Sequence, residues 1–237
     1  MARKKNEKLV VALDYDRPEP AMRMAKRLAG LVGMFKIGKQ LFTSEGPRAV
    51  ERLAKLEVGI FLDLKFHDIP NTVAGAVRAA AALPGVRLVT VHALGGMAMM
   101  RASATAIAGR KNRPKLLAVT LLTSMDEQAM RKVGILGPPV KRVVRLAQLA
   151  KAAGLDGVVA SAQEAAAIRA ACGSGFLIVV PGVRPQWASR GDQARVATPA
   201  AAIEAGADYL VVGRPITAAK NPRAAAEEVL REISASV

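Results

Sequence analysis

The segment FLDLKFHDIPNT, residues 61–72, begins like a buried β-strand but carries three ionisable side chains within six positions. These side chains are Asp63, Lys65 and Asp68. Because an unpaired charge is costly to bury, the three groups must either pair with one another or take part in chemistry. Asp63 and Lys65 are two residues apart, so strand geometry places them on the same face. The pattern predicts either a structural ion pair or a reactive site in which an amine lies beside carboxylates.

Two further segments have a composition suited to binding phosphate. PGVRP (181–185) and VVGRPIT (211–217) each place a glycine close to an arginine: Arg184 in the first, and Arg214 directly after Gly213 in the second. Glycine allows backbone N–H groups to approach an anion, and the guanidinium group offers a fork that matches phosphate oxygens. One such fragment is a weak signal, but the two together indicate a phosphate site.

The segment 184–197, which follows the first of these fragments, carries Trp187 and Gln193. A loop of this length in a compact domain is often a lid over a binding site. We therefore expect a phosphate lid here, and a disordered excursion is the alternative.

Elements that could position these residues follow from the alternation of apolar segments with longer helical patterns. The expected strands are residues 9–15, 34–39, 59–66, 88–93, 115–122, 157–162, 176–183 and 209–216. The expected helices are residues 18–32, 44–57, 70–83, 96–109, 138–153, 163–172, 198–206 and 221–235. The extra segment 124–137 is interpreted as a short helix in the loop after the fifth strand.

Near-continuous apolar strands are typical of a parallel sheet that helices cover on both faces. Eight successive βα units in a chain of 237 residues predict an α/β fold, a single-domain (β/α)8 TIM barrel. An open doubly wound sheet is the alternative. Neither a Pro/Gly/Ser-rich linker nor a step in composition divides the sequence, so we expect one domain over residues 1–237. Residues 1–8 are expected to form a basic N-terminal tail.

Active sites of such barrels lie at the C-terminal ends of the strands, and polar residues collect at these ends of the expected strands. They are Asp14, Lys36, Asp63, Lys65, His92, Thr123, Ser124, Arg184, Gly213 and Arg214. A single Asp–Lys pair could merely fill the barrel. Four charges that converge on one mouth are hard to explain by packing, so the pattern favours a functional site.

Asp68 lies three residues beyond Lys65, just before an expected helix. An acidic group there would interact favourably with the helix dipole. Alternatively, it supplies a second carboxylate close to a lysine, in its own site or in that of a neighbouring subunit. His67 is interpreted as a structural histidine, and His92 is assigned no role.

Composition narrows the classes of protein. The net charge of +16 would suit nucleic acid or anionic metabolites, but the basic residues are spread over many helices and are not interleaved with aromatic residues. One cysteine, Cys172, and two histidines cannot form a typical zinc site. The start, MARKKNEK, is not followed by a signal-peptide pattern, and no apolar run approaches the length of a membrane helix. We expect a cytoplasmic protein that binds neither membrane nor nucleic acid.

Six segments together resemble the orotidine 5′-phosphate decarboxylase family, and the resemblance runs from Leu9 to about Pro222. The segments are LDYD, FKIGKQLFTSEGP, FLDLKFHDIPNTV, LTS, PGVRP…GDQAR…TP and GADYLVVGRPIT. The D-x-K-x-x-D element is shared with related sugar-phosphate barrels, whereas HDIPNT and the paired phosphate motifs make the match more specific. The resemblance implies a homodimeric (β/α)8 barrel, free of metal and cofactor, that converts orotidine monophosphate to UMP and CO2.

The resemblance also implies a role for each matching residue. Lys65 would protonate C6 after CO2 leaves, and Asp63 would lie beside the departing carboxylate. The second subunit would contribute Asp68, Ile69 and Thr72. The remaining contacts would come from residues that hold the ribose (Asp14, Lys36), the pyrimidine edge (Thr123) and the phosphate (Arg184, Gln193, Gly213, Arg214).

These roles agree with the physical chemistry of the reaction. Decarboxylation leaves electron density on an sp² carbon that no carbonyl group can delocalise, and a fixed ammonium group stabilises such charge as it develops. Adjacent carboxylates favour the charged form of the amine between them.

Two other functions remain open at this point. A related magnesium-dependent keto-sugar-phosphate decarboxylase or synthase would use the same Asp/Lys array with a metal, although HDIPNT and Thr123 argue against it. A basic, non-catalytic nucleic-acid-binding protein has only the net charge in its favour.

Overall fold

The computed structural model describes residues 5–185, 187 and 197–235 of the chain. Eight parallel strands form a closed barrel in which each strand pairs with the next along the chain and the eighth pairs with the first. The strands are β1 (Leu9–Ala12), β2 (Met34–Gly38), β3 (Gly59–Phe66), β4 (Val86–His92), β5 (Lys115–Val119), β6 (Gly157–Val159), β7 (Leu177–Pro181) and β8 (Tyr209–Val212). The predicted (β/α)8 TIM barrel is confirmed.

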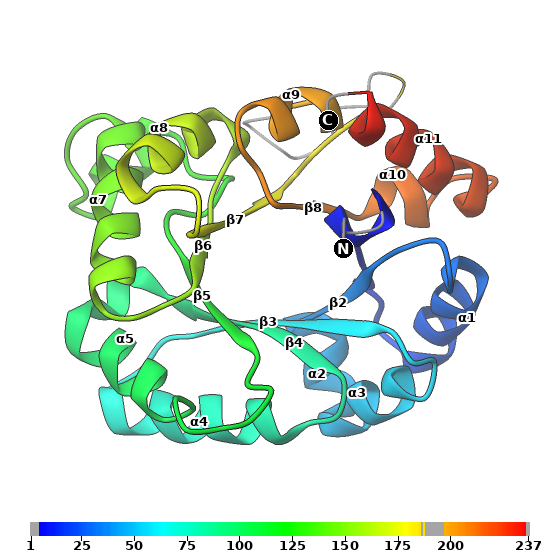
Figure 1. Ribbon diagram of the computed structural model, residues 1–237, viewed down its shortest axis with the longest axis horizontal. Coiled ribbons are helices and arrows are strands. Elements are labelled where there is room, and N and C mark those ends of the chain that lie inside the picture. The colour runs from blue at the N-terminus through cyan, green and yellow to red at the C-terminus, as the bar shows by residue number, and fades with distance from the viewer. Residues whose placement is uncertain (1–4, 186, 188–196, 236–237) are drawn as a thin grey trace.

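Helices form a ring around this barrel (Figure 1). The α-helices are α1 (Pro18–Leu28), α2 (Lys39–Glu45), α3 (Pro47–Ala54), α4 (Pro70–Ala82), α5 (Gly96–Thr105), α6 (Glu127–Lys132), α7 (Pro139–Ala152), α8 (Ala162–Cys172), α9 (Pro199–Glu204), α10 (Arg214–Thr217) and α11 (Pro222–Ser234). Two short 3-10 helices are η1 (Lys5–Lys8) and η2 (Ala93–Gly95). Several helices begin at a proline, whose fixed φ suits the first helical position.

The strands divide their side chains between two cores, because successive residues of a strand face opposite sides. The outward residues pack against the helices. The inward residues fill the barrel with a small apolar cluster: Val10, Ala12, Met34, Phe61, Leu88, Leu117, Val119, Val159, Val179, Tyr209 and Val211. Lys36, Asp63 and Thr90 come two residues after Met34, Phe61 and Leu88, respectively. The apolar filling therefore gives way to a polar layer toward the C-terminal ends of these strands.

The elements differ from the sequence expectations mainly at their ends. The helix expected over 44–57 is replaced by α2 and α3, which are separated by Gly46 with φ of 61°. The strand expected over 209–216 ends at Val212, because α10 begins at Arg214 with Gly213 as its N-cap. Both changes occur at a glycine close to a proline, Gly46 before Pro47 and Gly213 before Pro215, so the local backbone sets these boundaries.

The remaining expectations on organisation concern the segments that link these elements. The short helix expected in 124–137 is α6. Part of the expected tail, Lys5–Lys8, forms η1. Most of the expected lid 184–197, including Gln193, lies outside the described residues. Within the described part of the chain, no helix combines the length and apolarity required to cross a membrane.

Candidate active site

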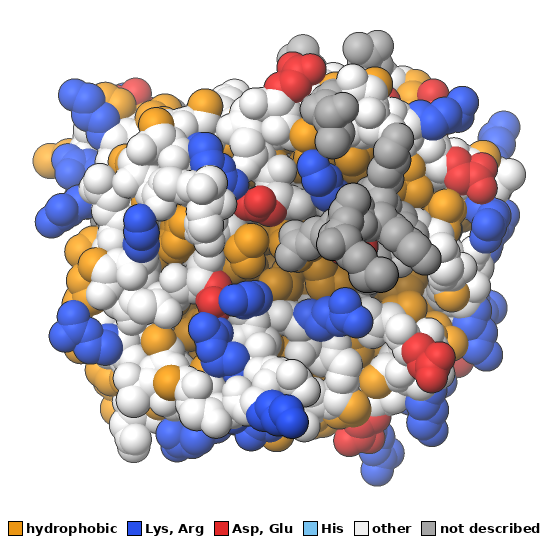
Figure 2. All heavy atoms as spheres, in the orientation of Figure 1, with side chains coloured by type: hydrophobic (Ala, Val, Ile, Leu, Met, Phe, Trp, Pro, Cys, Tyr) orange, Lys and Arg blue, Asp and Glu red, His pale blue; other side chains and the backbone are white. Residues whose placement is uncertain are grey.

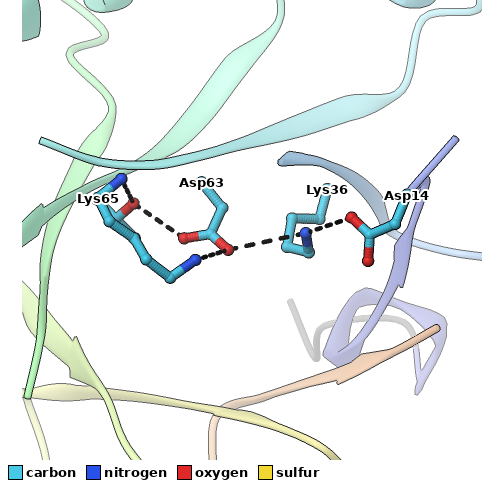
Figure 3. Close-up of polar contacts among 5 residues, drawn as sticks. Asp14, Lys36, Asp63 and Lys65 are labelled. Atoms are coloured by element: carbon cyan, nitrogen blue, oxygen red, sulfur yellow. Dashed lines mark hydrogen bonds and ion pairs between the residues drawn. The ribbon is translucent and has the colours of Figure 1, made fainter. Parts of the chain in front are cut away.

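The polar side chains at the mouth of the barrel form a chain of alternating charge (Figure 3). Lys36 Nζ donates to Asp14 Oδ1 at 3.0 Å and lies 3.7 Å from Asp63 Oδ2. Lys65 Nζ donates to the same Asp63 oxygen at 2.7 Å. The neighbouring strands β2 and β3 and the loop after β1 thus bring the four predicted charges into one array. The Asp63 carboxylate lies between two ammonium groups.

Burial makes this array electrostatically strong. The side chains of Lys36 and Asp63 are almost fully buried, whereas that of Lys65 is 26% exposed at the mouth. Burial alone would raise the pKa of Asp63. The ammonium groups of Lys36 and Lys65, together with hydrogen bonds from Lys65 and Thr90, nevertheless hold the pKa of Asp63 below its ordinary value. Asp63 is therefore a carboxylate at neutral pH.

Close approach to this array explains the glycine at the end of β2. A Cβ atom on Gly38 would lie 2.8 Å from Lys36 Nζ and 3.1 Å from Asp14 Oδ1. Any side chain at this position would displace one partner of the ion pair.

The backbone at Lys65 departs from regular strand geometry. β3 pairs Leu62 with Val89 of β4 and next pairs Phe66 with Val91, so three residues of β3 lie opposite Thr90 alone. Lys65 itself has φ of 53°, in the left-handed region that side-chain-bearing residues rarely adopt. Strand alternation predicted the proximity of Asp63 and Lys65, but a bulge in the strand, rather than regular alternation, sets the backbone at Lys65.

Thr90 belongs to the site and was not among the residues singled out from the sequence. Its hydroxyl accepts a hydrogen bond from the Lys65 backbone N–H at 2.9 Å and donates one to Asp63 Oδ1 at 3.0 Å. A threonine is ordinary in a β-strand, so composition gives no warning. Its inward position two residues after Leu88 was the signal that could have identified it.

Asp68, Ile69 and Thr72 lie together on an exposed surface where the loop after β3 enters α4. Ile69 is 67% exposed, which is unusual for a large apolar residue. The Asp68 carboxylate accepts from the adjacent Ile69 N–H, and α4 begins without a side-chain cap. Among the described ion pairs, none joins Asp68 to the lysines of its own chain. The structure therefore does not bring this segment into the array.

The candidate phosphate residues directly follow the neighbouring strands β7 and β8, which pair up to Pro181 and Val211. Arg184 lies in the loop after β7, and Gly213 and Arg214 lie where α10 begins. Arg184 is 7% exposed, and its backbone N–H donates to Ala197 O, which holds the ends of the 184–197 segment together. Burial, and then the nearby positive charge of Arg214, lowers the pKa of Arg184. Two guanidinium groups held near each other favour an anion between them.

Other residues at the mouth include Thr123 and a pair of histidines. Thr123 lies half-buried in the turn after β5. The His67 and His92 rings are stacked, with centroids 5.2 Å apart. Burial, and then the charges of His67, Lys39 and Lys65, lowers the pKa of His92 to about 4. His92 is therefore neutral at pH 7, and its Nδ1 accepts from Leu94 N–H.

The site offers fixed ammonium groups and a carboxylate, and Arg184 and Arg214 follow two other strands of the barrel at its C-terminal end. Over the described residues, no cluster of three or more His, Cys, Asp and Glu side chains is placed to hold a metal ion. Such an arrangement suits a reaction in which negative charge develops next to a positioned proton donor.

Comparisons with known proteins agree with this chemistry. Residues 7–229 match the profile of the family described as Orotidine 5′-phosphate decarboxylase / HUMPS family. A protein of Alkalilimnicola ehrlichii named orotidine 5′-phosphate decarboxylase is 53% identical, with 97% of each chain covered. One of Halorhodospira halophila with the same name is 56% identical, again over 97% of each chain. The crystal structure of orotidine 5′-phosphate decarboxylase from Lactobacillus acidophilus superposes with a TM-score of 0.83 at 39% identity, covering 95% of this chain and 98% of that one.

Proposed function

The chain belongs to the orotidine 5′-phosphate decarboxylase / HUMPS family, and we propose that its charged array decarboxylates orotidine 5′-phosphate without a metal or other cofactor. The enzyme is a carboxy-lyase, and we propose UMP as its product, in pyrimidine biosynthesis. The observation that carries the proposed mechanism is the buried chain of alternating charge at the mouth of the barrel. The steps below derive the mechanism from that chain.

The reaction breaks the bond between C6 of the pyrimidine and its carboxylate. The electron pair of this bond stays on C6, and CO2 leaves. The Lys65 ammonium then gives its proton to C6, forming the new C–H bond, and the resulting amine regains a proton from water. Because this ammonium is fixed by Asp63 at 2.7 Å, it needs little reorganisation as the negative charge develops.

Lys36 and Asp14 support this step from the ribose side. The Lys36 ammonium lies between Asp14 and Asp63, where it can donate to a ribose hydroxyl and hold Asp63 in place. Asp14 is about half exposed, so its second oxygen is accessible to the other ribose hydroxyl. Thr123, in the turn after β5, is proposed to contact the pyrimidine edge.

Arg184, Arg214, Gly213 and Gln193 are proposed to hold the phosphate. This grip is remote from C6, and binding energy from a remote group can order the site and so accelerate the chemical step. The buried position of Arg184 beside the charge of Arg214 supports the assignment. Gln193 enters on the sequence resemblance alone.

A homodimer with shared sites is proposed from the segment that begins at Asp68. Its members, Asp68, Ile69 and Thr72, are exposed at the mouth rather than engaged with their own array. An exposed Ile69 beside an exposed carboxylate suits insertion into a second subunit. Asp68 would then face Lys65 of that subunit and complete an Asp–Lys–Asp arrangement.

The first experiment adds orotidine 5′-phosphate to the wild-type chain with EDTA present and follows the loss of ultraviolet absorbance. We expect full turnover and stoichiometric UMP. Turnover only with added Mg²⁺ would instead support the related metal-dependent sugar-phosphate reaction. On the face of the molecule drawn in Figure 2, Lys and Arg side chains are spread out rather than gathered in one block, which argues against a nucleic-acid platform on that face.

A second experiment tests the shared site. Lys65→Ala and Asp68→Ala chains, each inactive alone, are mixed and allowed to exchange subunits. In a two-fold dimer about one site in four then regains both groups, so about one quarter of wild-type activity should return. Absence of any recovery despite proven exchange would contradict the shared site.

We further propose a cytoplasmic location, in keeping with the buried free thiol of Cys172. Cell fractionation tests this.

A further inference from the structure

We infer that Thr90 is a positioning residue for the decarboxylation, because its hydroxyl joins the backbone of Lys65 to the carboxylate of Asp63. The inference rests on the proposed function of Lys65 as the proton donor. Thr90 lies on β4 and is fully buried, so it does not touch the substrate. Its contribution would pass through the two residues that do.

The hydrogen bonds form a closed circuit. The Lys65 N–H donates to Thr90 Oγ1 at 2.9 Å, and Thr90 Oγ1 donates to Asp63 Oδ1 at 3.0 Å. The other Asp63 oxygen accepts from Lys65 Nζ at 2.7 Å. Both ends of Lys65 are therefore tied to one carboxylate, the backbone end through Thr90 and the ammonium end directly.

The bulge in β3 explains why the backbone end needs a partner. Three residues, from Asp63 to Lys65, lie opposite Thr90 between the paired positions at Leu62 and Phe66. The Lys65 N–H sits inside this bulge, at a residue with φ of 53°, where regular ladder pairing is interrupted. A strained backbone conformation persists only where surrounding contacts hold it in place. The hydrogen bond from the Lys65 N–H to the Thr90 hydroxyl is one such contact.

The role requires a group that donates and accepts at the same atom. A hydroxyl does both, a valine side chain of the same shape does neither, and serine retains the hydroxyl while losing only a methyl group. Thr90→Val therefore breaks the circuit at two points with little change in volume. Thr90→Ser keeps the circuit.

Thr120 provides a matched control. It is likewise fully buried, and its hydroxyl donates to Val159 O at 3.0 Å, outside the circuit. Thr120→Val thus removes one buried hydroxyl from the same barrel without touching the array.

The experiment compares the kcat for orotidine 5′-phosphate, the Kd for UMP and the unfolding midpoint in urea among wild type and the three variants. We expect Thr90→Val to lower kcat about 100-fold, because a small misplacement of a reacting group has this effect. UMP binding in this variant should change by less than about threefold, because Thr90 takes no part in the phosphate contacts and Lys36 keeps its closer partner, Asp14. Thr90→Ser should have a kcat within about threefold of wild type. Thr120→Val should leave kcat unchanged, even if its urea unfolding midpoint falls as far as that of Thr90→Val.

Two kinetic results would overturn the inference. One is a Thr90→Val enzyme with wild-type kcat, and the other is an enzyme whose kcat and UMP affinity fall together and are not restored by serine. A crystal structure of Thr90→Val supplies a readout that does not need activity. We expect Lys65 to leave the left-handed region or Asp63 to rotate away, and an unchanged array would overturn the inference. If wild type itself fails to turn over orotidine 5′-phosphate, the proposed function fails, whereas this structural comparison still decides whether Thr90 positions Lys65.

Discussion

Asp63→Asn tests whether the carboxylate between the two lysines holds the site together. The substitution keeps the size and shape of the side chain, and its amide oxygen can still accept from Thr90. It removes the negative charge and presents an NH2 group to at least one ammonium. The ammonium groups of Lys65 and Lys36, which lie 2.7 Å and 3.7 Å from the same Asp63 oxygen, then face each other without a negative charge between them.

The magnitude follows from these distances. With an effective dielectric constant of about 20, Coulomb's law gives about 6 kcal/mol for the attraction at 2.7 Å and about 4 kcal/mol for that at 3.7 Å. Desolvation offsets much of this attraction, and removal of one partner from a buried pair typically lowers stability by about 3 kcal/mol or slightly more. We expect that loss in the free energy of unfolding, together with a fall in kcat of at least about 100-fold as Lys65 moves.

Asp156→Asn is the matched control. The Asp156 carboxylate also lies between two cations, Arg113 at 2.6 Å and Lys115 at 3.0 Å, and it is 10% exposed, as Asp63 is. It precedes β6 at the opposite end of the barrel from the mouth. Asp156→Asn should therefore lower stability by a similar amount and leave kcat unchanged.

The assay pairs urea unfolding with the loss of ultraviolet absorbance of orotidine 5′-phosphate. An Asp63→Asn enzyme that kept more than about one tenth of wild-type kcat would refute the reasoning, since a 1 Å displacement alone should cost more. Equal loss of kcat in Asp63→Asn and Asp156→Asn would refute it as well, because the loss would then result from lower stability and not from disruption of the charged array.

Three further predictions concern other parts of the mouth. Gly38→Ala should lower kcat at least about tenfold with little loss of stability, because its Cβ would displace only the flexible end of Lys36, and steady-state kinetics with urea unfolding would show this. Arg214→Ala should raise the KM for orotidine 5′-phosphate about 10- to 100-fold yet leave turnover of orotidine, which lacks the phosphate, unchanged; equal effects on both substrates would contradict a phosphate contact. His92 has a pKa of about 4 in the native state and about 6.5 when unfolded, so the unfolded chain binds more protons and stability falls as pH drops from 6.5 toward 4. His92→Asn, which keeps an acceptor for Leu94 N–H, should therefore lose less unfolding free energy between pH 7 and pH 5 than wild type, and equal losses would contradict this.

Sequence patterns predicted the eight strands because buried parallel strands are apolar on both faces, which is a strong signal. They failed where the backbone at a glycine sets the boundary between two elements. The break between α2 and α3 depends on the backbone of Gly46, and α10 begins at Arg214 with Gly213 as its N-cap. These boundaries depend on backbone dihedral angles, for which the composition of the segment gives little indication.

The array at the mouth was predictable for a related reason. Charged residues in apolar strands stand out, and the barrel brings strand ends together, so Asp14, Lys36, Asp63 and Lys65 were all identified. Thr90 was missed because a threonine in a strand is unremarkable until its two hydrogen bonds are seen. The left-handed backbone of Lys65 was also missed. A regular strand would also place Lys65 on the same face as Asp63, so the sequence pattern gave no sign of the bulge.

The most direct test of the account is the rate of decarboxylation by Lys65→Ala on saturating orotidine 5′-phosphate in EDTA, measured beside wild type. The account predicts a fall in kcat of at least about 1000-fold, with UMP still bound and the circular dichroism spectrum unchanged, because proton donor and charge stabiliser are lost together. Wild-type turnover by this variant would contradict it.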